Sequence, residues 1–335
     1  MKNVTPRAEG KNEDTSIDQA LRPTRWEEYV GQANVKRNLR IIIDAAKRRR
    51  EPMDHVLFTG QAGLGKTTLA HLVAREMGAP FRVTSGPALE KAGDLAAVLS
   101  NLEPGEVLFI DEAHRMNRMI EEVLYPAMEA RKLHLMVGKG PSARSVSLDL
   151  PPFTLIAATT RENLLSGPLR SRFGATFRLD YYRLDDIKAI LSRSAKILGT
   201  AVAPEAVAVL ARASRATPRV ANRLLKRARD YAEVHGRRVV DNEISLSTLA
   251  LLEVDHLGLE PHDRRLLEII IRKFSGGPVG VGTLAAALSE DRGVIEDIYE
   301  PYLMNIGFLQ RTPAGRVALP AAYAHLGIAE KGVLL

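Results

Sequence analysis

The eight residues Gly60-Gln61-Ala62-Gly63-Leu64-Gly65-Lys66-Thr67 fit the pattern G-x-x-x-x-G-K-[ST], which indicates a loop that binds phosphate. An apolar run at 55–60 precedes them and a helical pattern at 69–78 follows, which is the context that the motif requires. In such a loop the glycines let backbone N–H groups close around phosphate oxygens, and the helix N-terminus adds partial positive charge. We expect Lys66 to reach the β- and γ-phosphates of ATP and the Thr67 hydroxyl to hold Mg²⁺.

Two more apolar runs, at 106–111 and 153–160, have the Val, Leu, Ile and Phe content of buried strands. Amphipathic helical patterns at 69–78 and 120–130 lie between the three runs. Strands that are separated by helices pair in parallel and are covered by those helices. Residues 1–182 are therefore predicted to form an α/β domain with a parallel sheet.

The strand predicted at 106–111 ends in two adjacent carboxylates. Asp111 suits Mg²⁺, directly or through water, and Glu112 suits a general base that polarises the attacking water. Thr159 and Thr160 end the next strand, where a polar side chain can touch the γ-phosphate or that water. Residues 111–114 also spell DEAH, the signature of a helicase superfamily, but we find none of the other motifs of that superfamily. These residues together indicate hydrolysis of ATP.

Two arginine-containing segments suit contacts with a nucleotide. Arg170 and Arg172 lie near the end of the ATPase domain, as does an arginine finger that reaches the γ-phosphate of a neighbouring subunit. Arg219 follows Thr217 and Pro218, which are typical of a helix N-cap and first turn, so it projects where phosphate is favoured. The alternatives are a solvated basic loop at 170–172 and an exposed or ion-paired arginine at 219.

Composition limits the class of protein. The length of 335 residues predicts two or three domains at ~150 residues each. The content of 45% apolar and 26% charged residues is that of a globular protein and excludes wholesale disorder. The absence of cysteine excludes disulfides and Cys-based metal sites, and it is compatible with the expected cytoplasmic location. No segment approaches the ~18 apolar residues of a membrane span. The N-terminus lacks the apolar core of a signal peptide, and we expect residues 1–20 to be disordered.

The net charge of +7 is a mild indication of nucleic-acid binding, and its distribution is uneven. Residues 1–182 carry 26 basic and 22 acidic side chains, a net charge of +4. Residues 183–255 carry 13 and 9, also +4, whereas residues 256–335 carry 8 and 9, a net charge of −1. The charge surplus therefore lies outside the last 80 residues.

The second half of the chain changes character twice. Residues 183–255 show four helical patterns and no strand signal, which predicts a small all-α domain. Residues 256–335 show three helical patterns followed by a hairpin at 307–319 with a turn at 312–315, an order that is typical of a winged helix. Arg311 and Arg316 flank that turn and Arg292 precedes the third helix, so we expect these three to contact DNA phosphates. The alternative is that this winged helix mediates protein contacts.

Residues 133–150 predict a second β-hairpin, inserted between the helix at 120–130 and the strand at 153–160. Leu133, Leu135 and Val137 alternate with polar residues, and Val146 and Leu148 resume the alternation after a Gly/Pro tip. An insertion at this point of an ATPase sheet must project outward, either as an idle surface hairpin or as a binding surface for a partner.

Long runs of this sequence resemble the RuvB family of the AAA+ class, the bacterial motors of Holliday-junction branch migration. The resemblance extends from about Leu21 to Gly327. Its most specific stretches are Leu21-Arg22-Pro23 and residues 84–115, 121–130, 140–145, 149–161, 168–174, 216–234, 274–280 and 307–316.

The resemblance implies a large ATPase domain at 1–182, a small helical domain at 183–255 and a winged-helix DNA-binding head at 256–335. It implies an ATP- and Mg²⁺-dependent homohexamer that moves Holliday junctions and duplex DNA, binds RuvA through the 133–150 hairpin, and meets RuvC in the resolution complex. It makes Arg172 the arginine finger and Thr160 the sensor. The nucleotide contacts that it implies, with the two glycines of the motif, are Leu21, Arg22, Gly63, Gly65, Lys66, Thr67, Thr68, Glu129, Ala130, Arg131, Arg172, Tyr182 and Arg219.

The sequence departs from this family where Gln61-Ala62 stand in place of two prolines and where Ala158 replaces glycine. Losing two fixed φ angles is expected to loosen the phosphate loop. Two other functions remain as alternatives, namely an AAA+ protein remodeller and a non-motor DNA-binding switch. The first needs an aromatic pore loop, of which we find no convincing example, and Glu112 and Arg172 argue against the second.

Overall fold

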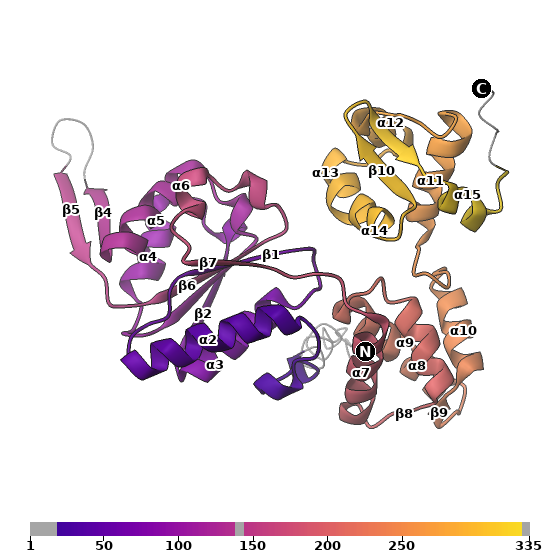
Figure 1. Cartoon of the computed structure of the whole chain (residues 1–335), viewed down its shortest axis with the longest axis horizontal. Coiled ribbons are helices and arrows are strands. Elements are labelled where there is room, and N and C mark those ends of the chain that lie inside the picture. The colour runs from indigo at the N-terminus through magenta and orange to yellow at the C-terminus, as the bar shows by residue number, and fades with distance from the viewer. Residues whose placement is uncertain (1–18, 138–143, 330–335) are drawn as a thin grey trace, which may run out of the picture. The chain divides into compact units, whose positions relative to one another are not determined.

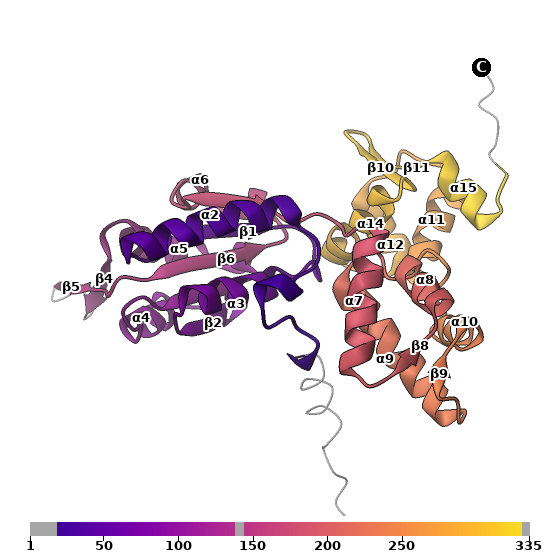
Figure 2. The ribbon, with the colours of Figure 1, turned by 60° about the horizontal axis from the view of Figure 1, so that its bottom comes forward.

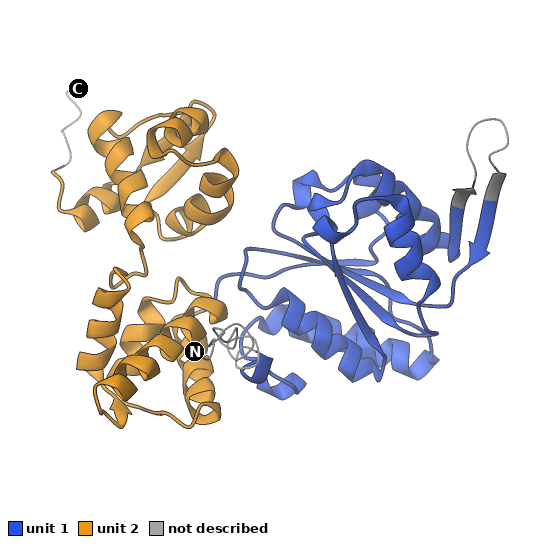
Figure 3. Cartoon of the chain, turned by 180° about the vertical axis from the view of Figure 1, so that it is seen from behind, with its two compact units in different colours: residues 1–182 blue, residues 183–335 orange. Residues whose placement is uncertain are grey.

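The computed structural model describes residues 19–137 and 144–329 of the chain. The chain divides into two compact units, residues 1–182 and 183–335 (Figure 3). The expectation of disorder at residues 1–20 lies outside the described residues for 1–18 and is wrong for residues 19 and 20, which are helical. The predicted hairpin tip at 138–143 also lies outside the described residues. Among the described residues, no helix is long and apolar enough to cross a membrane.

The first unit is built on a parallel five-stranded sheet in the order β2-β3-β6-β1-β7. The bounds are β1 Val56–Thr59, β2 Phe81–Ser85, β3 Val107–Asp111, β6 Thr154–Thr159 and β7 Ala175–Arg178. The three predicted strands are confirmed as β1, β3 and β6, which lie in the middle of the sheet. Their residues are buried almost throughout because helices cover both faces, which explains the continuous apolar runs.

The sequence analysis did not identify the two edge strands. Strand β2 is half-buried with one exposed residue, and β7 alternates between half-buried and exposed positions. Neither strand therefore carries the continuous apolar run that marks a central parallel strand.

Helices cover both faces of the sheet (Figure 1). On one face lie α2 (Ala33–Arg49) and α3 (Lys66–Met77), which contact each other. On the other lie α4 (Ala92–Ser100), α5 (Arg118–Ala130) and α6 (Gly167–Arg170). One continuous core joins this second layer to the sheet, and its members include Leu57, Leu108, Leu155, Leu95, Leu99, Ile120, Leu124, Leu169 and Phe173.

The predicted hairpin within residues 133–150 is confirmed for its two arms, β4 (Lys132–Val137) and β5 (Arg144–Asp149). The arms pair antiparallel from Lys132 with Asp149 to Val137 with Arg144. In Figure 1 the hairpin extends away from the sheet beside α5.

The second unit begins with the small helical domain predicted at 183–255, called the lid below, whose four predicted helices are confirmed. They are α7 (Leu184–Ile197), α8 (Pro204–Arg212), α9 (Pro218–Val234) and α10 (Asn242–Leu251). The expectation of an all-α domain is corrected in one detail, because β8 (Ala201–Val202) and β9 (Val239–Val240) pair in parallel. Two-residue strands are too short to leave an alternating pattern in the sequence. Figure 2 shows them side by side at one end of the helices.

The head follows with α11 (Pro261–Lys273), α12 (Val281–Leu288) and a third helix made of three segments. These are α13 (Arg292–Val294), a π-helical turn (Ile295–Tyr299) and α14 (Glu300–Asn305). The π turn has a local cause, because Pro301 has no N–H and its ring crowds the carbonyl of Asp297. Strands β10 (Leu309–Thr312) and β11 (Gly315–Ala318) form the predicted wing, and α15 (Pro320–Leu326) ends the described chain.

Candidate functional site

The phosphate loop joins β1 to α3, and its glycines are required by its backbone. Gly60, Gly63 and Gly65 have φ values of +134°, +81° and +94°, a region that side chains with a Cβ atom rarely adopt. A Cβ on Gly60 would lie 2.5 Å from the Leu179 carbonyl oxygen, and one on Gly65 would lie 2.8 Å from Tyr29 Oη. Space and conformation therefore both select glycine at these two positions.

Lys66, Thr67 and Asp111 meet at the carboxyl ends of β1 and β3. The Lys66 side chain is buried, and its Nζ donates to the carbonyl oxygens of Gly60 and Gln61 at 2.7 and 2.9 Å. Thr67 Oγ1 donates to Asp111 Oδ2 at 3.3 Å, so a hydroxyl and a carboxylate lie together beside the loop. Oxygen ligands of this kind are those that Mg²⁺ prefers. The donor set thus fits a magnesium nucleotide.

Two tyrosines pack beneath the phosphate loop. Tyr182 Oη donates to the Leu64 carbonyl oxygen at 3.1 Å and lies 3.2 Å from Tyr29 Oη, which approaches the same carbonyl at 3.4 Å. Burial, followed by the proximity of Tyr182, raises the pKa of Tyr29 well above its usual value. The Tyr29 phenol is therefore neutral, and both tyrosines hold the loop through its backbone.

Glu112 lies at the turn after β3 and faces a histidine. Its φ is +51°, and Gly86 packs so closely that a Cβ there would lie 2.3 Å from the Glu112 carbonyl oxygen. Glu112 Oε2 is 3.4 Å from His114 Nε2, and His114 Nδ1 is 2.9 Å from the hydroxyl of Thr159 at the end of β6. The His114 imidazole therefore links the Glu112 carboxylate to the end of β6.

Arg172 is held by three groups on α5 and α6. Its Nη2 is 3.1 Å from Glu129 Oε1, its Nη1 donates to the Pro168 carbonyl oxygen at 2.7 Å, and its guanidinium carbon is 4.5 Å from the centre of the Tyr125 ring. The Arg172 side chain is 20% exposed. The structure thus brings Arg172 and Glu129 together, two of the residues that the sequence analysis selected separately.

The remaining predicted nucleotide contacts lie on several elements. Leu21 is buried and Arg22 exposed in the segment before α2, Thr68 lies in the first turn of α3, and Thr160 is half-buried directly after β6. Ala130 and Arg131 are exposed at the end of α5. In the second unit, Arg219 is exposed in the first turn of α9, where Thr217 caps the helix by accepting a hydrogen bond from the Val220 N–H at 3.4 Å.

The wing arginines are not equally accessible. Arg316 is only 10% exposed, and it bonds the buried carboxylate of Glu300 through Nε at 2.7 Å and Glu296 through Nη2 at 3.1 Å. Arg311 shares Glu300 but is 47% exposed. The expectation that both arginines reach outward from the wing therefore needs correction for Arg316, because a buried carboxylate on the third helix draws it inward.

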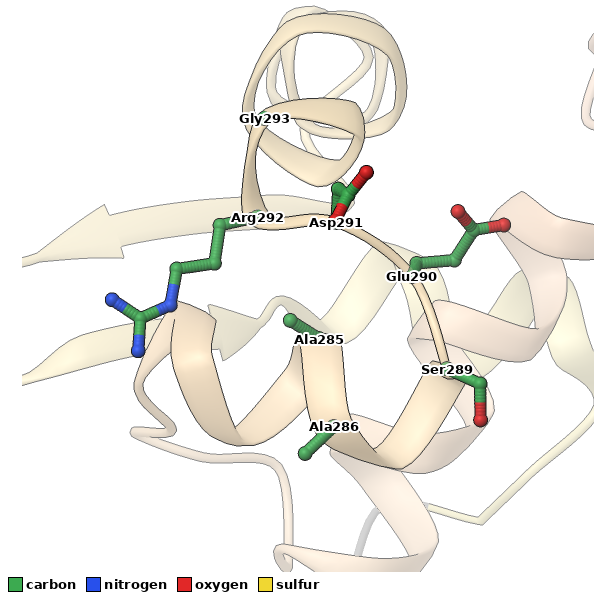
Figure 4. Close-up of a pocket in the computed structure, with 7 residues that line it drawn as sticks. All are labelled: Ala285, Ala286, Ser289, Glu290, Asp291, Arg292 and Gly293. Carbon is green, nitrogen blue, oxygen red and sulfur yellow. The ribbon is translucent and has the colours of Figure 1, made fainter.

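Arg292 lies beside a pocket of about 800 Å³ in the head (Figure 4). Arg292 and Glu290 extend on opposite sides of it. The Arg292 guanidinium lies against the backbone of Gly282, since a Cβ there would be 2.7 Å from Nη2. The exposed cation is thus positioned at the start of the third helix.

The sequence analysis missed several residues of these sites. Tyr29, His114 and Glu300 carried no signal of their own, because the fold brings each one to a partner far away in sequence, namely Tyr182, Thr159 and the wing arginines. Tyr125 lies within a run that carried the family resemblance, and its side chain packs on Arg172. The family resemblance of that run was the one feature of the sequence that pointed to the residues around Tyr125.

A phosphate loop on a parallel sheet, acids at the strand ends and a helical lid define an AAA+ ATPase. Three family models match the chain. They are described as the Holliday junction DNA helicase RuvB P-loop domain at residues 21–179, the RuvB AAA lid domain at 182–255, and the RuvB C-terminal winged helix domain at 256–327. The chain belongs to the RuvB family of Holliday junction branch migration ATPases.

Solved structures agree with this assignment. The RuvB Holliday junction branch migration motor of Thermotoga maritima is 45% identical, with a TM-score of 0.85 over 93% of this chain and 99% of that one. An alanine-to-serine variant of the same protein is also 45% identical, with a TM-score of 0.86 over 92% of this chain and 99% of that one.

Proposed function

We propose that this chain hydrolyses Mg²⁺-ATP between the subunits of a homohexameric ring and uses the free energy to pull duplex DNA during branch migration. The observation that carries the proposal is the cluster at the carboxyl ends of β1 and β3. There the buried Lys66 meets the Thr67–Asp111 pair, and Glu112 follows one residue later.

Each residue of the cluster has a role that its position supports. Lys66 leaves the Gly60 and Gln61 carbonyl oxygens to bind phosphate, while Thr67 and Asp111 hold Mg²⁺, which neutralises phosphate charge when it is bound. Glu112 accepts a proton from the attacking water as general base.

Arg172 serves as the arginine finger of the neighbouring subunit's site. An arginine already bound to Glu129 and stacked on Tyr125 loses little conformational freedom when it moves to a phosphate. Thr160 and Arg219 respond to the γ-phosphate from the large domain and the lid. Leu21, Arg22 and Tyr182 contact the adenosine part of ATP.

The head contacts the DNA backbone through Arg292 and Arg311, with Arg316 holding the wing in place. Because the head carries a net charge of −1, its grip depends on a few placed cations and is weak enough to release. The β4–β5 hairpin binds RuvA, since Val146 and Leu148 are 38% and 41% exposed and lie on one face of β5. RuvC joins in the resolution complex.

Branch migration of a synthetic four-way junction, with and without RuvA and ATP, tests the proposal. We expect migration that requires ATP and is stimulated by RuvA, and its loss in Lys66→Ala. ATP-dependent unfolding of a folded protein without junction movement would identify a remodeller, and ATP-dependent DNA binding without movement would identify a switch.

A further inference from the structure

The lid and the head, both parts of the second unit, meet at a buried ion pair. Arg215 lies between α8 and α9, and Asp263 lies in the first turn of α11. Arg215 Nη1 donates to Asp263 Oδ2 at 2.7 Å and Nη2 donates to Oδ1 at 3.4 Å, so the pair is bidentate. The Asp263 side chain is fully buried and that of Arg215 is 11% exposed. A bidentate pair that excludes water fixes both distance and direction.

The same guanidinium also contacts the third helix of the head. Its carbon is 4.7 Å from the centre of the Tyr302 ring, and Nη2 donates to the Ile298 carbonyl oxygen at 3.3 Å. Tyr302 in turn donates from Oη to the Leu257 carbonyl oxygen in the linker between lid and head. One lid side chain therefore ties together the first and third helices of the head.

The backbone around Arg215 is tightly constrained. Arg215 and Ala216 have φ values of +53° and +52°, which is unfavourable for residues with a Cβ and persists only where the surroundings enforce it. A Cβ on Gly258 would lie 2.4 Å from the Ala213 carbonyl oxygen, so the linker presses directly on the lid. The joint is packed, whereas linkers between domains are usually exposed and mobile.

This joint lies close to the start of α9. Only three residues separate Arg215 from Arg219, and Thr217 holds that segment through hydrogen bonds to the Ser214 carbonyl oxygen and the Val220 N–H. Because this segment is short and hydrogen-bonded, a displacement of Arg219 is passed directly to Arg215 and through it to the third helix of the head.

We propose that Arg215 is a positioning residue that fixes the lid to the third helix of the head, so that a displacement of Arg219 moves the head with the lid as one body. The proposal rests on the proposed function, because it takes Arg219 as a nucleotide contact and the head as the DNA contact.

The joint supplies a matched control. Arg223 of α9 also bridges to the head, through Nη2 to Glu260 Oε1 at 2.6 Å, but its side chain is 52% exposed. An exposed ion pair contributes little, so Arg223→Ala removes an arginine at the same joint without removing the buried contact.

The first experiment measures the rigidity of the joint by itself. Because the chain has no cysteine, spin labels can be attached at Lys196→Cys on α7 and Glu268→Cys on α11, which are both exposed. We expect one narrow distance distribution in the otherwise unaltered chain and in Arg223→Ala. Arg215→Lys, which keeps the charge but loses the fork and the stacking, should broaden it. An unchanged distribution would overturn the proposal without reference to ATP or DNA.

The second experiment measures coupling, as junctions moved per ATP hydrolysed with RuvA present. Arg215→Ala and Arg215→Lys should keep KM for ATP and DNA affinity within about two-fold but lower this ratio about ten-fold, while Arg223→Ala leaves it unchanged. An undiminished ratio in Arg215→Lys would overturn the proposal. If the unaltered protein moves no junctions, the proposed function fails instead, and the label distances still decide whether the joint is rigid.

Discussion

Glu112 is the proposed general base, and it lies in the strained turn after β3. Its φ of +51° is held by the close approach of Gly86, and its carboxylate lies within 3.4 Å of His114. Glu112→Gln keeps the shape and removes the base. We expect ATP to bind with near-normal affinity while kcat falls about 10²–10⁴-fold, measured by nucleotide binding and by phosphate release. Near-normal turnover would remove Glu112 from this role.

Arg172 lies beside Glu129 in its own chain, which suits a group that acts on a neighbour. If Arg172→Ala subunits are mixed with Lys66→Ala subunits, some mixed interfaces pair an intact phosphate loop with an intact arginine. We expect partial recovery of ATPase activity over either variant alone. No recovery at any mixing ratio would contradict action in trans in a ring whose sites fire independently.

We expect His55 to make the stability of the large domain depend on pH. Its Nδ1 accepts from the Leu155 N–H at 2.8 Å and its Nε2 faces the Met128 carbonyl oxygen at 3.3 Å, so the neutral ring links β6 to α5. Burial lowers the pKa of His55 below its ordinary 6.5. The unfolded chain therefore binds more protons as pH falls below about 6.5, and the free energy of unfolding should fall by at most about 1.4 kcal/mol per pH unit.

Denaturant unfolding of the large domain between pH 7.5 and 5 measures this dependence. His55→Gln should reduce the slope, and the exposed His71→Gln should leave it unchanged. An equal slope in His55→Gln and the unaltered chain would assign the pH dependence to other groups.

At the scale of the element, the wing hairpin separates two kinds of arginine. Arg311→Ala should weaken DNA binding without lowering the Tm of the head. The slope of log K against log salt concentration should decrease in magnitude by about 1 for each phosphate that the arginine neutralises. Arg316→Ala instead leaves the buried Glu300 with less compensation and should destabilise the head by about 3–5 kcal/mol. Fluorescence anisotropy over a salt series, with the exposed Arg272→Ala on α11 as control, distinguishes the two.

The phosphate loop has Gln61 and Ala62 where the resemblance implies two prolines. Ala62 is exposed and Gln61 half-buried, and the Gln61 carbonyl oxygen accepts from Lys66. Replacing both residues by proline should raise the free energy of unfolding by about 0.4–1 kcal/mol each, because the unfolded chain loses conformations. Chemical denaturation measures this gain, and a loss of stability would mean that the φ angles here do not suit proline.

At the scale of the whole molecule, the charge of +7 does not identify the DNA-binding domain. The surplus lies in residues 1–255, and several of its arginines are assigned to nucleotide or to structural ion pairs. The head has a net charge of −1, and its exposed cations act from fixed positions. In the proposed ring, a few such contacts from each subunit would add to a grip that can still be released.

The proposed attachment to RuvA also belongs to the scale of the whole molecule. Val146→Ser with Leu148→Ser removes exposed apolar surface from β5 and leaves the sheet core intact. We expect intrinsic ATPase activity to stay within about two-fold and the stimulation of branch migration by RuvA to be lost. Val83→Ser, at an exposed residue of β2, is the control. Stimulation that survives the double change would place the RuvA contact elsewhere.

The sequence by itself determined what short, local patterns can encode. The phosphate loop, the central strands that end at Asp111 and Thr159, the lid helices and the wing turn all follow from runs of fewer than about twenty residues, because burial on both faces and helix periodicity leave local traces. Only the tertiary structure decided the edge strands, the His114–Thr159 contact and the fate of Arg316. A half-buried edge has no distinctive pattern, and an arginine beside a turn is accessible or buried according to a carboxylate that another helix supplies, here Glu300.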